Sequence, residues 1–196
     1  MKRIKILGII GIAVIGALLI YRHFDKVKVI DDDYNKFSSE YTLLNKDNIY
    51  TYSSIDKILN ILDNGTGVIF LCTPESEWCQ HYALYLNDEL KNNGIDEINY
   101  LNIKDYRELN TAKYQKLIDY LSDYIYVDDL GNSKIFMPDV TFVKNGNIVF
   151  HNNETSLVAS DQTTADYWTE GKILEFKNNL RDGIILLNND IVEGVE

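Results

Sequence analysis

Hydrophobic positions from residue 48 onward follow two kinds of pattern. Short apolar runs have the length of buried strands, and they occur at 48–52, 67–71 and 98–103. Stretches with apolar residues at helical spacing follow each run, at 53–65, 78–93 and 111–125. The pattern therefore predicts three strands that alternate with three helices.

The last third of the chain has a different rhythm. Two β-rich runs within 139–150 are joined by Asn145-Gly146, a pair typical of a tight hairpin because both turn positions need a positive φ. A final helix is expected within 164–187. Candidates for its buried face are Trp168, Ile173, Phe176 and Leu180. Alternation gives a parallel portion and the hairpin an antiparallel one, so we expect a mixed sheet flanked by helices in an α/β fold.

The N-terminus differs from the rest. An uncharged apolar run, Ile6–Tyr21, lies between basic flanks, and its 16 residues approach the length of a membrane-spanning helix. A cleaved signal peptide and a buried core helix are the alternatives. The residues after the run are bulky, unlike a signal-peptidase site, so we expect 1–24 to be an uncleaved signal anchor with the large domain on the extracytoplasmic side of the cell membrane. The polar, weakly patterned stretch 25–47 is interpreted as a linker, 48–190 as the domain and 191–196 as a tail.

Charge supports this division. The chain has 19 basic and 30 acidic residues. Residues 1–28 contain six of the basic residues and one of the acidic ones. The remainder therefore carries 13 basic and 29 acidic residues, a formal charge of −16. Such a domain is repelled by nucleic acid, and we expect no nucleic-acid partner.

Candidate chemistry is confined to the two cysteines, Cys72 and Cys79, in the stretch "CTPESEWC". The sequence contains no C-x-x-C, zinc-site spacing or phosphate-binding glycine loop, so we expect neither a metal nor a cofactor. The three histidines, His23, His81 and His151, are isolated from one another and are interpreted as surface residues rather than ligands.

The order of elements, with a loop and a helix start after the central strand, resembles the thioredoxin fold. The stretches "GTGVIFLCTPESEWCQHYALYLNDELKNNGIDEINYLNIKD" and "MPDVTFVKNGNIV" resemble small thioredoxin-like proteins of Gram-positive bacteria, including bacteriocin transport accessory proteins. The site loop of that family typically reads P-[DE]-C-P-x-C. The resemblance covers roughly residues 48–190.

The resemblance implies where the site residues lie. Ser76 stands where the family has its first, nucleophilic cysteine, and Cys79 stands at the second, resolving position. Pro138 matches the family's cis proline, which implies a cis Met137–Pro138 bond next to the site loop and a peptide-binding groove at Met137. The buried acid that assists proton transfer in this fold would fall at Phe70, which cannot titrate. A serine hydroxyl supplies no thiolate near neutral pH, so the site is altered at its nucleophile.

The role of the cysteines is open at this stage. Cys72 is either a small buried core residue or the partner of Cys79 in a disulfide across the loop, which needs α-carbons within about 7 Å. In an alternative register, "WCQHY" matches the W-C-x-x-C of ordinary thioredoxins, and Cys79 would then be an exposed single thiol.

Three functions remain in competition. The first is a membrane-anchored binding or accessory module that holds an extended peptide or a secreted protein beside Pro138, without ordinary dithiol reductase activity. The second is an atypical thiol–disulfide oxidoreductase that uses Cys79, with or without Cys72. The third is a structural domain on a stalk, whose cysteines have no chemical role.

Overall fold

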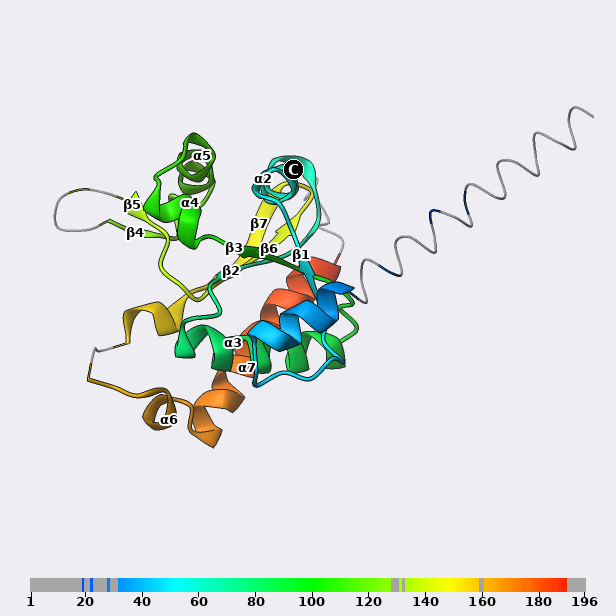
Figure 1. Ribbon diagram of the computed structural model, residues 1–196, viewed down its shortest axis with the longest axis vertical. Helices are drawn as coiled ribbons and strands as arrows, with labels where there is room; N and C mark the ends of the chain where they lie inside the picture. The colour runs from blue at the N-terminus through cyan, green and yellow to red at the C-terminus, as the bar shows by residue number, and fades with distance from the viewer. Residues whose placement is uncertain are drawn as a thin grey trace, which may run out of the picture.

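The fold is described from a computed structural model (Figure 1). It describes residues 19, 22, 28, 32–127, 131, 133–158 and 161–189. The predicted signal anchor, 1–24, and the tail, 191–196, lie outside these residues apart from positions 19 and 22. Within the described part of the chain, no helix has the length and apolar character that crossing a membrane requires.

A five-stranded mixed sheet forms the centre of the molecule, in the order β1-β3-β2-β6-β7. The strands are β1 (Tyr50–Tyr52), β2 (Gly67–Cys72), β3 (Ile98–Asn102), β6 (Asp139–Lys144) and β7 (Asn147–Asn152). The first three run parallel to one another, whereas β6 is antiparallel to both β2 and β7. The predicted mixed α/β sheet is therefore confirmed. Strand β2 lies at its centre and is buried from Val68 to Cys72.

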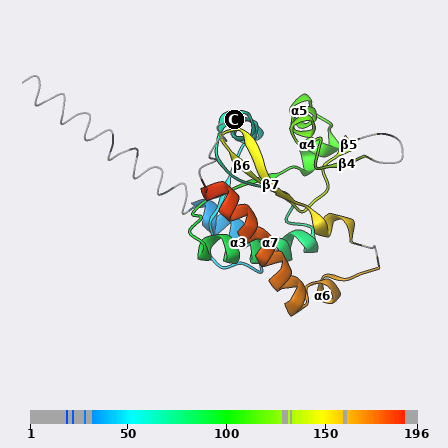
Figure 2. The same ribbon diagram turned by 180° about the vertical axis from the view of Figure 1, so that it is seen from behind.

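Helices cover both sides of this sheet (Figure 1). On one side lie α2 (Ile55–Asn64) and α5 (Ala112–Tyr120). On the other side lie α3 (Glu77–Asn92) and α7 (Glu170–Asn188), which contact each other and cross at an angle (Figure 2). The remaining elements are short: α4 (Lys104–Glu108), β4 (Tyr126–Val127), β5 (Ser133–Lys134), the 3-10 turn Glu154–Leu157 and α6 (Thr164–Tyr167).

Local side-chain chemistry explains where these helices begin and why the hairpin turns. A hydroxyl at the N-cap accepts a backbone N–H two or three residues into the helix, as at Ser54, Ser76 and Thr169. Asn145 and Gly146 have φ of 50° and 76°, so the predicted hairpin turn is confirmed. Thr169 begins α7 afresh after Trp168, and the region expected to form one helix therefore contains two, α6 and α7.

The segment expected to be a linker is instead part of the domain from residue 32. Residues 32–40 are helical, and Phe37, Tyr41 and Leu44 are buried in the core. Phe37 stacks on Tyr41 and Tyr50, with ring centroids 4.1 and 3.9 Å apart. The linker interpretation of 25–47 is thus wrong for 32–47. The reason is that this helix and the turn after it place only three apolar side chains in the core, which are too few to give a conspicuous pattern.

Candidate functional site

The two cysteines form a disulfide. Cys72 ends β2, Cys79 lies in the first turn of α3, and their α-carbons are 5.9 Å apart. Both residues are fully buried. The bridge closes a short loop, a constraint that stabilises the folded state by about 2–3 kcal/mol. Of the open alternatives, the structure therefore has the disulfide, and no free cysteine is present.

Ser76 serves as the cap of α3. Its Oγ accepts a hydrogen bond from the backbone N–H of Cys79, 3.3 Å away. The cap orients the first turn so that Cys79 points inward, where the N–H of Thr73 lies 3.5 Å from its sulfur. Ser76 thus occupies the half-buried helix start, while the sulfur of the fully buried Cys79 is bonded to that of Cys72.

Phe70 lies in the centre of the aromatic core. It is fully buried and stacks against Tyr82, with ring centroids 5.7 Å apart. No titratable group therefore occupies the position at which the family resemblance places a buried acid. If the disulfide were reduced, no carboxylate at this point of β2 could exchange a proton with the resulting thiols.

Charged residues line the outer side of the loop. Glu75 accepts a very short hydrogen bond from the hydroxyl of Thr73, and its carboxylate lies 3.6 Å from the ammonium of Lys104 in α4. The hydrogen bond from Thr73 is the main cause that lowers the pKa of Glu75, a backbone hydrogen bond to its carboxylate follows, and the charge of Lys104 adds a smaller effect. Glu75 is therefore ionised at neutral pH and neutralises Lys104.

The peptide bond between Met137 and Pro138 is cis, as predicted. Met137 is half-buried at the entry to β6, and Pro138 is buried behind it. Within the described residues, the main-chain N–H and C=O of Met137 make no hydrogen bond. These two groups are therefore available to an extended chain, which is how an incoming peptide pairs with a strand.

Met137 and the disulfide loop share a cavity of about 270 Å³, here called the Met137 hollow. It is lined by Thr73, Glu75, Ser76, Lys104, Arg107, Glu108 and Met137. The structure thus brings Ser76 and Met137, two of the predicted site residues, to one depression. The two cysteines do not line it, because they lie beneath the loop.

A second cavity of about 490 Å³ adjoins this one through Arg107, and we call it the Lys134 hollow. Besides Arg107, its lining includes Asn110, Tyr114, Gln115, Ser133 and Lys134. Arg107 is half-buried and lines both cavities. The site therefore extends from the disulfide loop along α4 to β5.

The segment between β7 and α7 closes the opposite side of the loop. Thr164 donates a hydrogen bond of 2.6 Å to the carboxylate of Glu77, the first residue of α3. Tyr167 packs edge-on against Trp78, with ring centroids 5.5 Å apart. These contacts hold the segment before α7 against the first turn of α3.

A buried polar pair is the feature that the sequence analysis missed. Asp139 is fully buried, and its Oδ2 lies 2.8 Å from Nε2 of His151, whose side chain is 6% exposed. The surface interpretation of His151 is therefore wrong: a diagonal neighbour on the hairpin supplies a carboxylate. A signal was present, since Asp139 begins a strand that is buried from Asp139 to Val143, and His151 lies near the end of its hairpin partner. Asp139 pairs with Leu71, whose side chain packs on the α2/α5 side, whereas the disulfide packs on the α3/α7 side.

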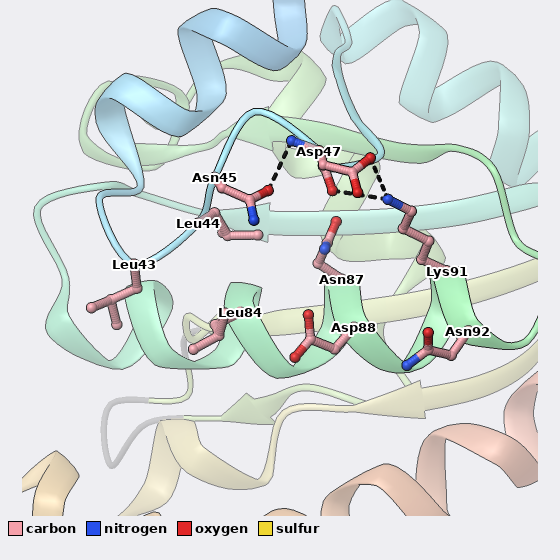
Figure 3. A pocket seen from close by; sticks show the side chains of 9 residues that line it. All are labelled: Leu43, Leu44, Asn45, Asp47, Leu84, Asn87, Asp88, Lys91 and Asn92. Carbon is pink, nitrogen blue, oxygen red and sulfur yellow. Dashed lines mark hydrogen bonds and ion pairs between the residues drawn. The ribbon is translucent and has the colours of Figure 1, made fainter.

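A further cavity of about 330 Å³ lies between residues 43–47 and α3 (Figure 3). Lys91 reaches from α3 to the main-chain oxygen and carboxylate of Asp47, and Asn87 accepts the N–H of Ile49 at 3.0 Å. Its polar groups hold the N-terminal segment onto α3. This cavity is therefore explained by packing and lies apart from the Met137 hollow.

Among the described residues, no three His, Cys, Asp or Glu side chains are grouped as a metal site would require. No family model matches the chain, and neither a curated protein nor a solved structure matches it.

Proposed function

We propose that this chain is a membrane-anchored, extracytoplasmic thioredoxin-like binding module. In this proposal the Met137 hollow holds an extended segment of a peptide or secreted protein, and the domain does not carry out ordinary dithiol exchange. The thioredoxin assignment is supported by the position of β2 between parallel β3 and antiparallel β6, with the disulfide loop leading from β2 into α3.

The observation that carries the proposal is the burial of the Cys72–Cys79 disulfide behind a serine-capped helix start. Thiol–disulfide exchange requires a thiolate to reach one of the two sulfurs. Here both cysteines are fully buried, and the half-buried helix start holds the hydroxyl of Ser76. Meanwhile the main-chain N–H and C=O of Met137, beside the loop, make no hydrogen bond with any residue that the structure describes. The geometry thus favours binding over exchange.

A reductase assay tests the chemical half of the proposal. We expect the full-length chain to reduce a disulfide-bonded test protein no faster than its Cys79→Ala variant. A turnover higher than that of the Cys79→Ala variant would instead support the alternative function, an atypical thiol–disulfide oxidoreductase. The double variant Cys72→Ala/Ser76→Cys places a thiol at the helix start, three residues before Cys79, and we expect it to gain measurable activity.

Peptide selection tests the binding half. A phage-displayed library of random linear peptides would be selected on the full-length chain. Enriched peptides should protect the Met137 amide from hydrogen exchange, because they pair with it. If no peptide is enriched, or enriched peptides leave this amide unprotected, the groove is not a peptide site.

The membrane attachment rests on the Ile6–Tyr21 run and its basic flanks. We expect the full-length chain to partition with membranes and a chain that begins at Lys28 to be recovered in the soluble fraction. A mature N-terminus near residue 22 would show cleavage and would contradict the anchor.

A further inference from the structure

Arg107 has an unusual position among the cations of this acidic chain. It is half-buried, and it lines both the Met137 hollow and the Lys134 hollow. Within the described residues, its guanidinium forms no ion pair, whereas neighbouring Lys104 pairs with Glu75 and Lys113 pairs with Asp56. A guanidinium carries five donors in a fixed plane, which suits a carboxylate.

The surrounding charges favour an anion at this point. Once the Lys104–Glu75 pair is set aside, the charged groups of the two hollows are Arg107, Lys134 and Glu108. Lys134 has no ion pair with a described residue either. Among the described residues, the lining of the two hollows together therefore carries one net positive charge, on a chain whose formal charge is −11. The excess comes from Lys134, since Lys104 and Arg107 balance Glu75 and Glu108 in the Met137 hollow itself. The charge of Arg107 also reaches Tyr114, where burial raises the pKa of the phenol and Arg107 opposes that rise.

We propose that Arg107 makes the groove selective for an extended peptide segment that carries a carboxylate side chain. A chain paired with the main-chain groups of Met137 would run past Arg107, because both residues line one cavity. A carboxylate on that chain would gain a charge-assisted hydrogen bond at a half-buried site, where water screens it less than on an open surface. This inference rests on the proposed peptide groove and adds the chemical class of its ligand.

The same selection experiment tests the inference. Peptides enriched on the full-length chain should share an Asp or Glu at one position. A synthetic copy of an enriched peptide should bind about tenfold more tightly than its Glu→Gln counterpart, a ratio typical of one charge-assisted hydrogen bond. Arg107→Gln should abolish this ratio. Lys113→Gln, which removes an exposed cation of the neighbouring helix, should preserve it.

The outcomes separate the two proposals. Enrichment of peptides without an acidic position, or a tenfold ratio that persists in Arg107→Gln, would overturn the role of Arg107 and leave the groove intact. Failure to enrich any peptide would overturn both. To exclude a folding effect, the Arg107→Gln chain should keep the wild-type unfolding midpoint.

Discussion

On the α3/α7 side of the sheet nine of the clustered buried residues are aromatic, whereas the α2/α5 side has one, Tyr114, among Ile, Leu and Val. The aromatic side includes the disulfide and the helix at 32–40. Its rings interlock across several elements, as Phe70 does with Tyr50, Tyr82 and Tyr100. The aliphatic side instead contains the buried pair Asp139–His151.

The difference explains how the Cys72–Cys79 disulfide comes to be buried. Large rings that contact one another fill the volume around the disulfide, so no solvent path to its sulfurs remains. The aliphatic side is formed by two amphipathic helices, α2 and α5, and its cluster contains no residue of the N-terminal segment 32–47. We therefore expect substitutions on the aromatic side to lower the free energy of unfolding more than substitutions on the aliphatic side.

The largest effect is expected from Phe37→Ala. Its side chain is fully buried between Tyr41 and Tyr50, so its removal leaves a cavity under the helix at 32–40. We expect the free energy of unfolding to fall by about 3–5 kcal/mol. Denaturant unfolding measures it, with Leu43→Ala as the control, because Leu43 is 44% exposed. Equal effects of the two substitutions would mean that 32–47 is a linker after all.

Phe37 also marks the limit of what the sequence predicts. Helices α2, α3 and α5 repeat apolar residues over several turns, and the hairpin has its Asn-Gly turn, so each was predictable from local pattern. The helix at 32–40 contributes few core residues, and its stability comes from tertiary contacts that no local pattern encodes. The cis bond at Pro138 followed from the family resemblance. The Asp139–His151 pair and the position of Arg107 depend on how β6, β7 and α4 are placed, which local pattern leaves undetermined.

Alkaline pH should destabilise the aromatic side. Burial raises the pKa of Tyr41, Tyr50 and Tyr82 well above the ordinary value near 10. The folded state therefore keeps these phenols protonated, while the unfolded state releases their protons above about pH 10. The stability is complete below that pH and is lost as pH rises through the folded pKa. These three groups alone give a loss of about 4 kcal/mol per pH unit, and Tyr52 and Tyr100, whose pKa values burial also raises, add to it.

The measurement is the free energy of unfolding in denaturant at a series of alkaline pH values. Tyr50→Phe should reduce the slope by about 1.4 kcal/mol per pH unit, the contribution of one phenol that no longer titrates. Lysines also titrate in this range, and the difference between the two chains removes their contribution. A slope that is identical in both chains would show that Tyr50 ionises equally in the folded and unfolded states.

A smaller effect is expected where α7 meets the sheet. A Cβ added at Gly183 would lie 2.6 Å from the ring of Phe150, whereas one at Gly171 in the same helix would meet nothing within 4 Å. Gly183→Ala should therefore cost about 2 kcal/mol through overpacking, after a gain from helix propensity. Gly171→Ala should be neutral or slightly stabilising. Thermal unfolding measures the change in stability of both variants. If Gly183→Ala leaves the stability unchanged, α7 can move away from β7.

The smallest effect is expected on the aliphatic side, from Asp139→Asn. The carboxylate of Asp139 accepts from the His151 ring and, at 3.3 Å, from the hydroxyl of Thr141. An amide has the same shape and keeps one acceptor oxygen, so only the charge and part of the bonding are lost. We expect about 1–2 kcal/mol of destabilisation in denaturant unfolding. Thr141→Val, which removes the longer bond alone, should cost less.

Because the pair faces away from the disulfide, neither variant should change the accessibility of Cys72 and Cys79 to a reductant. Faster reduction in Asp139→Asn than in Thr141→Val would show that the pair supports the disulfide through the sheet, and the two sides would then not be independent.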